Sequence, residues 1–158
     1  MTLARWSLLI ALVAAATIAG AWIFQLAGYA PCELCLKERI PYYTGAPLAF
    51  VAFLLATRHK VGAGRAVLAL VALIFAGGTV LAVYHSGVEF GWWPGPSDCT
   101  GDFAAAASTQ DFLKQLQTVQ VVRCDAVAIR VFGLSLAAWN AVISPALAVA
   151  ATLGVMRR

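Results

Sequence analysis

Four cysteines are the residues of this chain whose type and spacing best suit a chemical reaction. Cys32 and Cys35 form a CxxC pair, whereas Cys99 and Cys124 stand 25 positions apart. A CxxC pair at the start of a helix brings two sulfurs together where the helix N-terminus stabilises a thiolate. The pattern favours thiol–disulfide exchange. Four cysteines allow three pairings, and spacing alone does not decide among them, although a close pair and a distant pair are the simplest choice.

Two other uses of the cysteines are less well supported. A zinc site needs a second close pair of ligands, and neither His59 nor His85 falls at zinc-finger spacing. We therefore predict no metal. Purely structural disulfides are the stronger alternative, but a chain that is held by membrane spans has little need of covalent cross-links.

Arg39 and His85 are the residues outside the cysteines that could take part in the reaction. Arg39 follows Cys35 by four positions, so the two side chains share one face of a helix. Its permanent charge could stabilise a thiolate or an anionic reduced cofactor, or it could simply reach the lipid headgroups or pair with Glu38. His85 ends an apolar stretch and could donate a proton or a hydrogen bond to a cofactor, or serve only as a polar cap.

The elements that must position these residues are membrane spans. Of the 158 residues, 62% are hydrophobic and 11% are charged, whereas a soluble domain carries about 25% charged residues. Lipid must therefore solvate much of the chain. Four uncharged apolar stretches can cross or nearly cross a hydrocarbon core about 30 Å thick, and they cover residues 6–27, 40–56, 66–84 and 132–155. The first stretch also resembles a signal peptide, but its apolar run continues past the possible cleavage site.

Charge asymmetry predicts the orientation of these spans. Six basic residues lie at the two termini and between the second and third spans, and all seven acidic residues lie in the other two connections. The positive-inside rule places the termini in the cytoplasm and loops 28–39 and 85–131 outside. All four cysteines then face the oxidising side of a bacterial inner membrane. The basic clusters lie between apolar runs, which argues against nucleic-acid binding.

The sequence thus predicts an all-α integral membrane protein of one domain, residues 1–158, built as a four-helix transmembrane bundle. In the second outward loop, residues 103–120 have helical periodicity, with Phe112, Leu113, Leu116 and Val119 on one face. An amphipathic helix on the outer membrane surface is one interpretation, and a partly ordered loop is the other.

Two segments resemble the DsbB family, the inner-membrane disulfide oxidases that are linked to quinone. Residues 31–39 read PCELCLKER, which resembles the family signature P-C-x-L-C-x-x-E-R. Residues 132–136, FGLSL, with Trp139 and Asn140, resemble the segment that leads into the last span of the family. Four spans and a cysteine pair in each outward loop extend the resemblance over most of the chain. Ile129 departs from the pattern, because the family often has tryptophan there.

The resemblance implies a role for each pair. Cys32–Cys35 would be a disulfide that passes electrons to ubiquinone or menaquinone, with Cys35 closest to the quinone. Arg39 would assist quinone binding, and His85 is a further candidate for the cofactor site. Cys99–Cys124 would be a disulfide that is attacked by a soluble thioredoxin-like partner, DsbA, and Cys99 would form the mixed disulfide.

These roles define a relay hypothesis with two rivals. Electrons would pass from the partner to the wide cysteine pair, then to the CxxC pair and to quinone, so the second loop must bring its sulfurs to the first. A membrane reductant that runs electrons outward has the same cysteine pattern. A non-catalytic membrane subunit or a small transporter with structural disulfides is the rival from another class, although spans without charge argue against ion transport.

Overall fold

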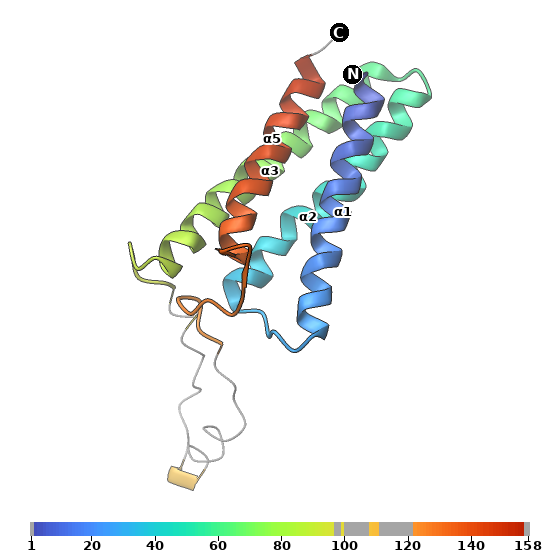
Figure 1. Ribbon diagram of the computed structural model, residues 1–158. Helices are drawn as coiled ribbons and strands as arrows, with labels where there is room; N and C mark the ends of the chain where they lie inside the picture. Colours follow the sequence, from blue (N-terminus) through green and yellow to red (C-terminus); the bar gives the residue numbers. More distant parts are fainter. Residues whose placement is uncertain (1, 97–98, 100–107, 111–121, 157–158) are drawn as a thin grey trace.

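Four long helices and a short hairpin make up the computed structural model, which describes residues 2–96, 99, 108–110 and 122–156 (Figure 1). The elements in chain order are α1 (Leu3–Leu26), α2 (Glu33–Thr57), α3 (Val61–Glu89), β1 (Arg130–Val131), β2 (Leu134–Ser135) and α5 (Leu136–Met156). The four helices are long and apolar enough to cross a membrane. The predicted all-α, four-helix membrane fold is therefore confirmed. The amphipathic helix predicted over 103–120 falls largely outside the described residues.

The helices pack as a closed ring in which each contacts its two neighbours. α2 lies against α1 and α3, and α5 lies against α3 and α1. Small residues allow the close approaches, as membrane helices require. A Cβ atom at Gly45 on α2 would lie 2.7 Å from the ring of Phe75 on α3, and one at Gly78 on α3 would lie 3.0 Å from Pro41. The packing of α2 on α3 therefore depends on glycines that let a side chain of one helix lie against the backbone of the other.

A buried polar network fixes α2 relative to α5. The Tyr42 hydroxyl donates to Oδ1 of Asn140 over 2.5 Å, and Ser144 donates to the same oxygen over 2.9 Å. All three residues are buried. In an apolar surrounding such groups have few other partners, so the hydrogen bonds set the register of the two helices.

The two ends of the bundle differ in what they carry. Both termini and the short α2–α3 connection lie at one end (Figure 1). The connection from α1 to α2 and the described residues between α3 and α5 lie at the other end, so all four cysteines belong there.

The helices at this second end have different limits from the predicted spans. α2 begins at Glu33 rather than at residue 40, because Cys32 caps it, and α3 continues from residue 84 to Glu89. α5 begins at Leu136 rather than at 132. The backbone of Phe132 and Gly133 is left-handed, with φ of 50° and 85°, which makes a hairpin turn instead of a helix. The site residues predicted in loops therefore lie mainly on helix ends.

Candidate active site

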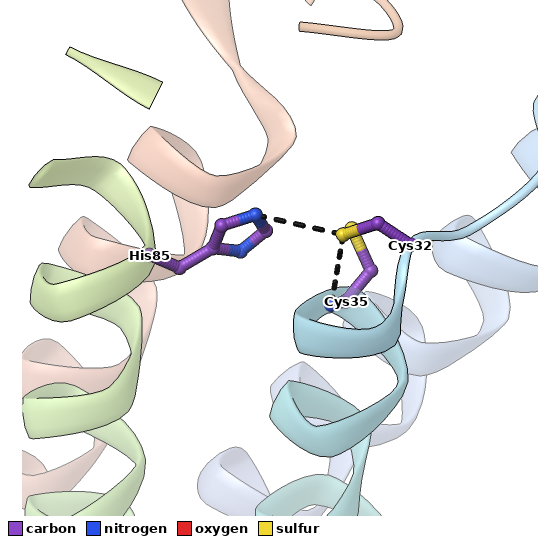
Figure 2. Close-up of side chains that lie close together, drawn as sticks. All are labelled: Cys32, Cys35 and His85. Carbon is purple, nitrogen blue, oxygen red and sulfur yellow. Dashed lines mark hydrogen bonds between the residues drawn. The ribbon is translucent and has the colours of Figure 1, made fainter. Parts of the chain in front are cut away.

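Cys32 and Cys35 lie at the N-terminus of α2, where the helix itself holds one sulfur. Cys32 is the N-cap residue, and its Sγ accepts a hydrogen bond from the backbone N–H of Cys35 over 3.2 Å. The two Sγ atoms are 2.8 Å apart (Figure 2). Both cysteines are free thiols, which differs from the predicted Cys32–Cys35 disulfide. Hydrogen bonding from Cys35 holds the pKa of the Cys32 thiol below its ordinary value, so the thiolate form is favoured.

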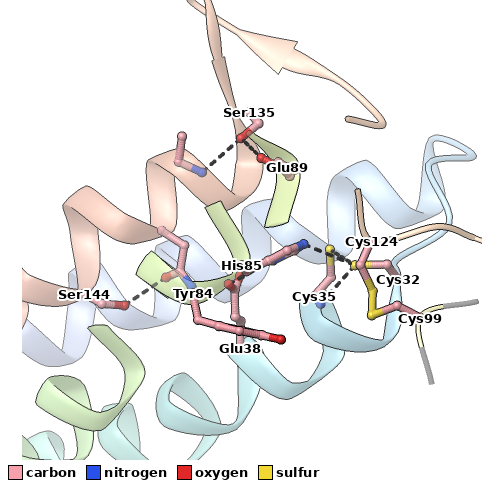
Figure 3. Close-up of polar contacts among 12 residues, drawn as sticks. Cys32, Cys35, Glu38, Tyr84, His85, Glu89, Cys99, Cys124, Ser135 and Ser144 are labelled. Atoms are coloured by element: carbon pink, nitrogen blue, oxygen red, sulfur yellow. Dashed lines mark hydrogen bonds and ion pairs between the residues drawn. A yellow bond between two sulfur atoms is a disulfide. The ribbon is translucent and has the colours of Figure 1, made fainter. Parts of the chain in front are cut away.

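His85 approaches this pair from the last turns of α3. Its Nε2 atom lies 3.6 Å from Sγ of Cys32 (Figure 2). Its Nδ1 atom lies 3.0 Å from Oε1 of Glu38, which Figure 3 includes. His85 is 1% exposed and Glu38 is 7% exposed. When Glu38 is ionised it can only accept, so Nδ1 then carries the proton, and a neutral ring directs the Nε2 lone pair at the sulfurs. The arrangement Glu38–His85–Cys32 can move a proton to or from a thiol.

Glu38 borders the site, although the sequence pattern gave it no role beyond a possible ion pair with Arg39. Two signals were available, because Glu38 is also the E of the P-C-x-L-C-x-x-E-R signature. Glu38 follows Cys35 by three positions, so the two share a helix face. The histidine that it contacts is 47 positions away on another helix, and local sequence pattern does not reveal such pairs.

Arg39 points away from Glu38 and toward α1. Its Nη1 donates to Oε1 of Gln25 over 2.6 Å, and its guanidinium lies 5.6 Å from the ring centre of Trp22. The residue is 8% exposed. Gln25 and Trp22 thus hold the guanidinium by a hydrogen bond and a cation–π contact, rather than by the ion pair with Glu38 considered as an alternative.

A cavity of about 370 Å³ opens beside this group between α1, α2 and α5. Cys35, Glu38 and Arg39 contribute polar atoms to one side, and the other walls are mainly apolar. Its aromatic lining consists of Phe24, Tyr29, Tyr42, Phe132 and Trp139. The volume lies in the range of about 300–1,000 Å³ that is common for small-molecule sites. Apolar walls with a few convergent polar groups suit a flat, hydrophobic ligand with polar edges.

Cys99 and Cys124 are joined by a disulfide, with their Cα atoms 5.4 Å apart. This bond lies in the same buried apolar cluster as Cys32, together with Leu34 and Val88 (Figure 3). The described residues thus bring both cysteine pairs together, although the pairs are far apart in sequence. The relay hypothesis expected the second loop to carry its pair to the first, and the structure already holds them side by side.

Aromatic residues at the end of α3 and just after it pack together near the disulfide, and two of them line a hollow with it. Trp93 stacks on Tyr84 with ring centres 6.0 Å apart, and its indole N–H donates to the Tyr84 carbonyl over 2.9 Å. Gly87 makes room for this indole, because a Cβ there would lie 2.0 Å from Trp93. A hollow on this side is lined by Trp92, Trp93, Cys99, Arg123, Cys124 and Asp125, among others.

Comparison with known proteins agrees with this geometry. A family model described as "Disulfide bond formation protein DsbB" matches residues 4–154. The chain belongs to the DsbB family. DsbB membership suggests a membrane protein of disulfide-bond formation, and the two cysteine pairs that lie together at one end of the bundle are the candidate active site.

One curated relative is also similar to the chain. The "Uncharacterized protein RP370" of Rickettsia prowazekii (strain Madrid E) is 25% identical over 118 residues, which is 73% of this chain. The chain spans 66% of the length of that relative, slightly less than two thirds. No solved structure matches the chain.

The residues predicted for the site gather at the cysteine end of the DsbB fold. Cys32, Cys35 and His85 form one group, Arg39 lines the cavity, and the Cys99–Cys124 bond adjoins Cys32. Ile129 was singled out as a departure from the DsbB pattern. The cavity nevertheless has aromatic walls, because other helices and the hairpin turn supply them.

Proposed function

We propose that the chain is a quinone-dependent protein-disulfide oxidoreductase that reoxidises a DsbA-like, thioredoxin-fold partner on the periplasmic side of a bacterial inner membrane. One observation carries this proposal. A buried cluster holds both cysteine pairs, and the CxxC pair of that cluster also borders an apolar cavity. Electrons can therefore enter from a soluble partner at one side and leave toward the membrane at the other.

The first stage uses the Cys99–Cys124 bond. A partner thiolate attacks one sulfur, for which we propose Cys99, and Cys124 leaves as a thiolate. The second partner thiol then attacks the mixed disulfide, so the partner becomes oxidised and this pair becomes a dithiol. The hollow beside the bond, with Trp92, Arg123 and Asp125 in its walls, gives the partner access.

The second stage moves two electrons to the CxxC pair. A thiolate of Cys99 or Cys124 attacks the Cys32–Cys35 disulfide, and a second exchange restores Cys99–Cys124 and leaves two thiols on α2. Sulfurs must meet in line for this exchange, and the shared cluster brings the two pairs close together. A dithiol at Cys32 and Cys35 beside a Cys99–Cys124 disulfide is the product of this stage.

The third stage regenerates the Cys32–Cys35 disulfide at the cavity. The residues present fit a quinone: the walls are apolar and aromatic, Cys35 lies in the wall, and Arg39 can donate to a carbonyl oxygen. A bound ubiquinone or menaquinone would accept the two electrons and two protons that the thiols release. Cys32 has the stabilised thiolate, and the Nε2 atom of His85 can take the second proton.

Charge placement supports the proposed orientation. Arg5, Arg58, Lys60 and Arg65 lie near the end of the bundle that holds the termini. Cytoplasmic loops of inner-membrane proteins carry such an excess of basic residues. With the termini in the cytoplasm, the cysteine end faces the periplasm, where disulfides persist.

Anaerobic turnover of the purified protein in detergent tests the proposal. The assay combines a reduced thioredoxin-fold CxxC protein with a short-chain ubiquinone or menaquinone and follows quinone absorbance. We expect one quinone to be reduced for each partner disulfide formed, and no turnover in Cys35→Ser. The proposal fails if neither quinone supports partner oxidation, or if only quinol-driven reduction of the oxidised partner is seen.

A further inference from the structure

Three metal-ligating atoms converge at the start of α2. Sγ of Cys32, Sγ of Cys35 and a ring nitrogen of His85 all lie within 4.8 Å of one another (Figure 2). Two cysteines and a histidine are a ligand set typical of zinc, with one coordination position left open. Sequence spacing argued against a metal because it offered no second cysteine pair. The third ligand instead comes from α3, which the fold brings to the CxxC pair.

The orientation of His85 is the one that metal sites require. Glu38 contacts Nδ1 over 3.0 Å, which leaves Nε2 directed at Cys32. A carboxylate on the far nitrogen of a ligating histidine is a recurrent feature of zinc sites, where it fixes the tautomer and raises ligand basicity. This contact is independent of the cysteines, since it joins side chains of α2 and α3 on the other side of the ring.

The distance from sulfur to nitrogen also suits tetrahedral coordination, whereas the distance between the two sulfurs requires a movement of one side chain. With Zn–S bonds of about 2.3 Å and Zn–N bonds of about 2.0–2.1 Å, a tetrahedral ion separates a sulfur ligand from a nitrogen ligand by about 3.6 Å. The observed distance from Cys32 Sγ to His85 Nε2 is 3.6 Å. The same geometry needs the two sulfurs about 3.8 Å apart, compared with 2.8 Å here. Rotation of the Cys35 side chain, which is only half-buried, provides this shift.

We propose that the dithiol form of this protein binds one thiophilic divalent ion, Zn²⁺ or its analogue Co²⁺, through Cys32, Cys35 and His85. Coordination uses two thiolates and a neutral imidazole, so two thiol protons are released for each ion bound. The disulfide form has no thiolate to offer. Metal binding and formation of the Cys32–Cys35 bond therefore exclude each other, and the ion holds the protein in its reduced form. The inference stands on these three residues and does not depend on quinone.

Cobalt and zinc titration of the full chain in detergent tests the inference. A Cys99→Ser, Cys124→Ser background removes the other two thiols, so that Cys32 and Cys35 can be reduced alone. We expect one Co²⁺ per chain with thiolate-to-cobalt charge-transfer absorption, displacement by Zn²⁺, release of two protons, and no binding after oxidation to the disulfide. A stoichiometry well below one, or equal binding by the oxidised protein, contradicts the proposal.

Substitutions of His85 and Glu38 distinguish a three-residue metal site from non-specific binding of the ion by two thiols. His85→Ala should weaken Zn²⁺ binding at least about tenfold, and Glu38→Gln should weaken it about 10- to 100-fold, as loss of an outer-shell partner does. His59→Ala is the matched control, because His59 lies in the α2–α3 connection at the opposite end, and its affinity should equal that of the parent. Thermal unfolding of each variant shows whether it is folded. Equal Zn²⁺ affinity in folded His85→Ala and His59→Ala proteins would overturn the inference.

Discussion

The Nδ1 atom of His85 lies 3.0 Å from Oε1 of Glu38, and this contact joins α3 to α2 directly behind the CxxC pair. An ionised Glu38 holds the proton of His85 on Nδ1, so Nε2 can accept a proton from the CxxC pair. Glu38→Gln offers an amide N–H to Nδ1 instead, which places the ring proton on Nε2. We expect turnover with quinone to fall about 10- to 100-fold, since proton transfer by a positioned side chain contributes about 10²–10⁴-fold.

A second measurement on Glu38→Gln distinguishes loss of the His85 orientation from a loss of protein stability. The pH profile of Cys32 alkylation should change in Glu38→Gln, whereas a merely structural defect would leave it unaltered. Glu33→Gln is the matched control, because Glu33 is part-exposed on the same helix and pairs with Lys37. Unchanged turnover in Glu38→Gln would show that the contact only holds the helices together.

The reactivity of Cys32 should depend on the side chain at position 35. Hydrogen bonding from Cys35 lowers the pKa of the Cys32 thiol, so iodoacetamide should alkylate Cys32 in the reduced protein at lower pH than an ordinary thiol. The thiolate is lost as the pH falls through this lowered pKa. Cys35→Ala removes the side-chain donor and should raise the midpoint. Cys35→Ser keeps a hydroxyl donor, so its alkylation midpoint should lie closer to that of the parent protein. Identical midpoints in the two variants would exclude the side-chain hydrogen bond as the cause.

Arg39 should act on quinone affinity more than on the maximal rate. The Arg39→Lys variant keeps the charge but loses the planar group that stacks on Trp22 and binds Gln25. A loss of about 1.4 kcal/mol corresponds to a tenfold change, and we expect KM for quinone to rise about tenfold with a smaller change in kcat. Arg58→Lys, at the other end of α2, is the control and should keep the parental KM. A fall in kcat with unchanged KM would assign Arg39 to the chemical step instead.

We expect that Gly87, which makes room for Trp93, protects the Cys99–Cys124 bond from reduction. Gly87→Ala places a methyl group 2.0 Å from Trp93, so the indole must leave its stack on Tyr84. Overpacking of this kind costs about 1–3 kcal/mol. Reduction of the Cys99–Cys124 bond by dithiothreitol should become faster, and thermal unfolding should occur at lower temperature. Gly77→Ala is the control on the same helix, where a Cβ meets nothing within 4 Å. Equal unfolding temperatures in the two variants would contradict the packing assignment.

Much of the fold could be predicted because hydropathy is a strong signal. Lipid-solvated helices need long uncharged stretches, and these were visible for all four helices. The ends were less accurate for a physical reason. α2 and α3 each continue by several polar or small residues beyond their apolar stretches, and Cys32 and Ser135 cap helices through side-chain hydrogen bonds that hydropathy does not measure.

The parts of the candidate site that lie close together in the sequence could be predicted, whereas contacts between residues far apart in the sequence could not. The CxxC spacing and the Arg39 position follow from helix periodicity. The contact of Glu38 with His85 joins positions that are 47 apart, and Gln25 binds Arg39 from another helix. Such contacts depend on how helices rotate against each other, which small residues such as Gly78 decide.

The order of disulfide formation tests the relay most directly. The fully reduced protein is mixed anaerobically with one equivalent of quinone, quenched with an alkylating agent at successive times, and mapped by mass spectrometry. We expect the Cys32–Cys35 bond to form first and the Cys99–Cys124 bond to follow, and we expect no Cys99–Cys124 bond in a Cys32→Ser, Cys35→Ser variant. Quinone-driven formation of the Cys99–Cys124 bond in that variant, at the parental rate, would contradict the relay.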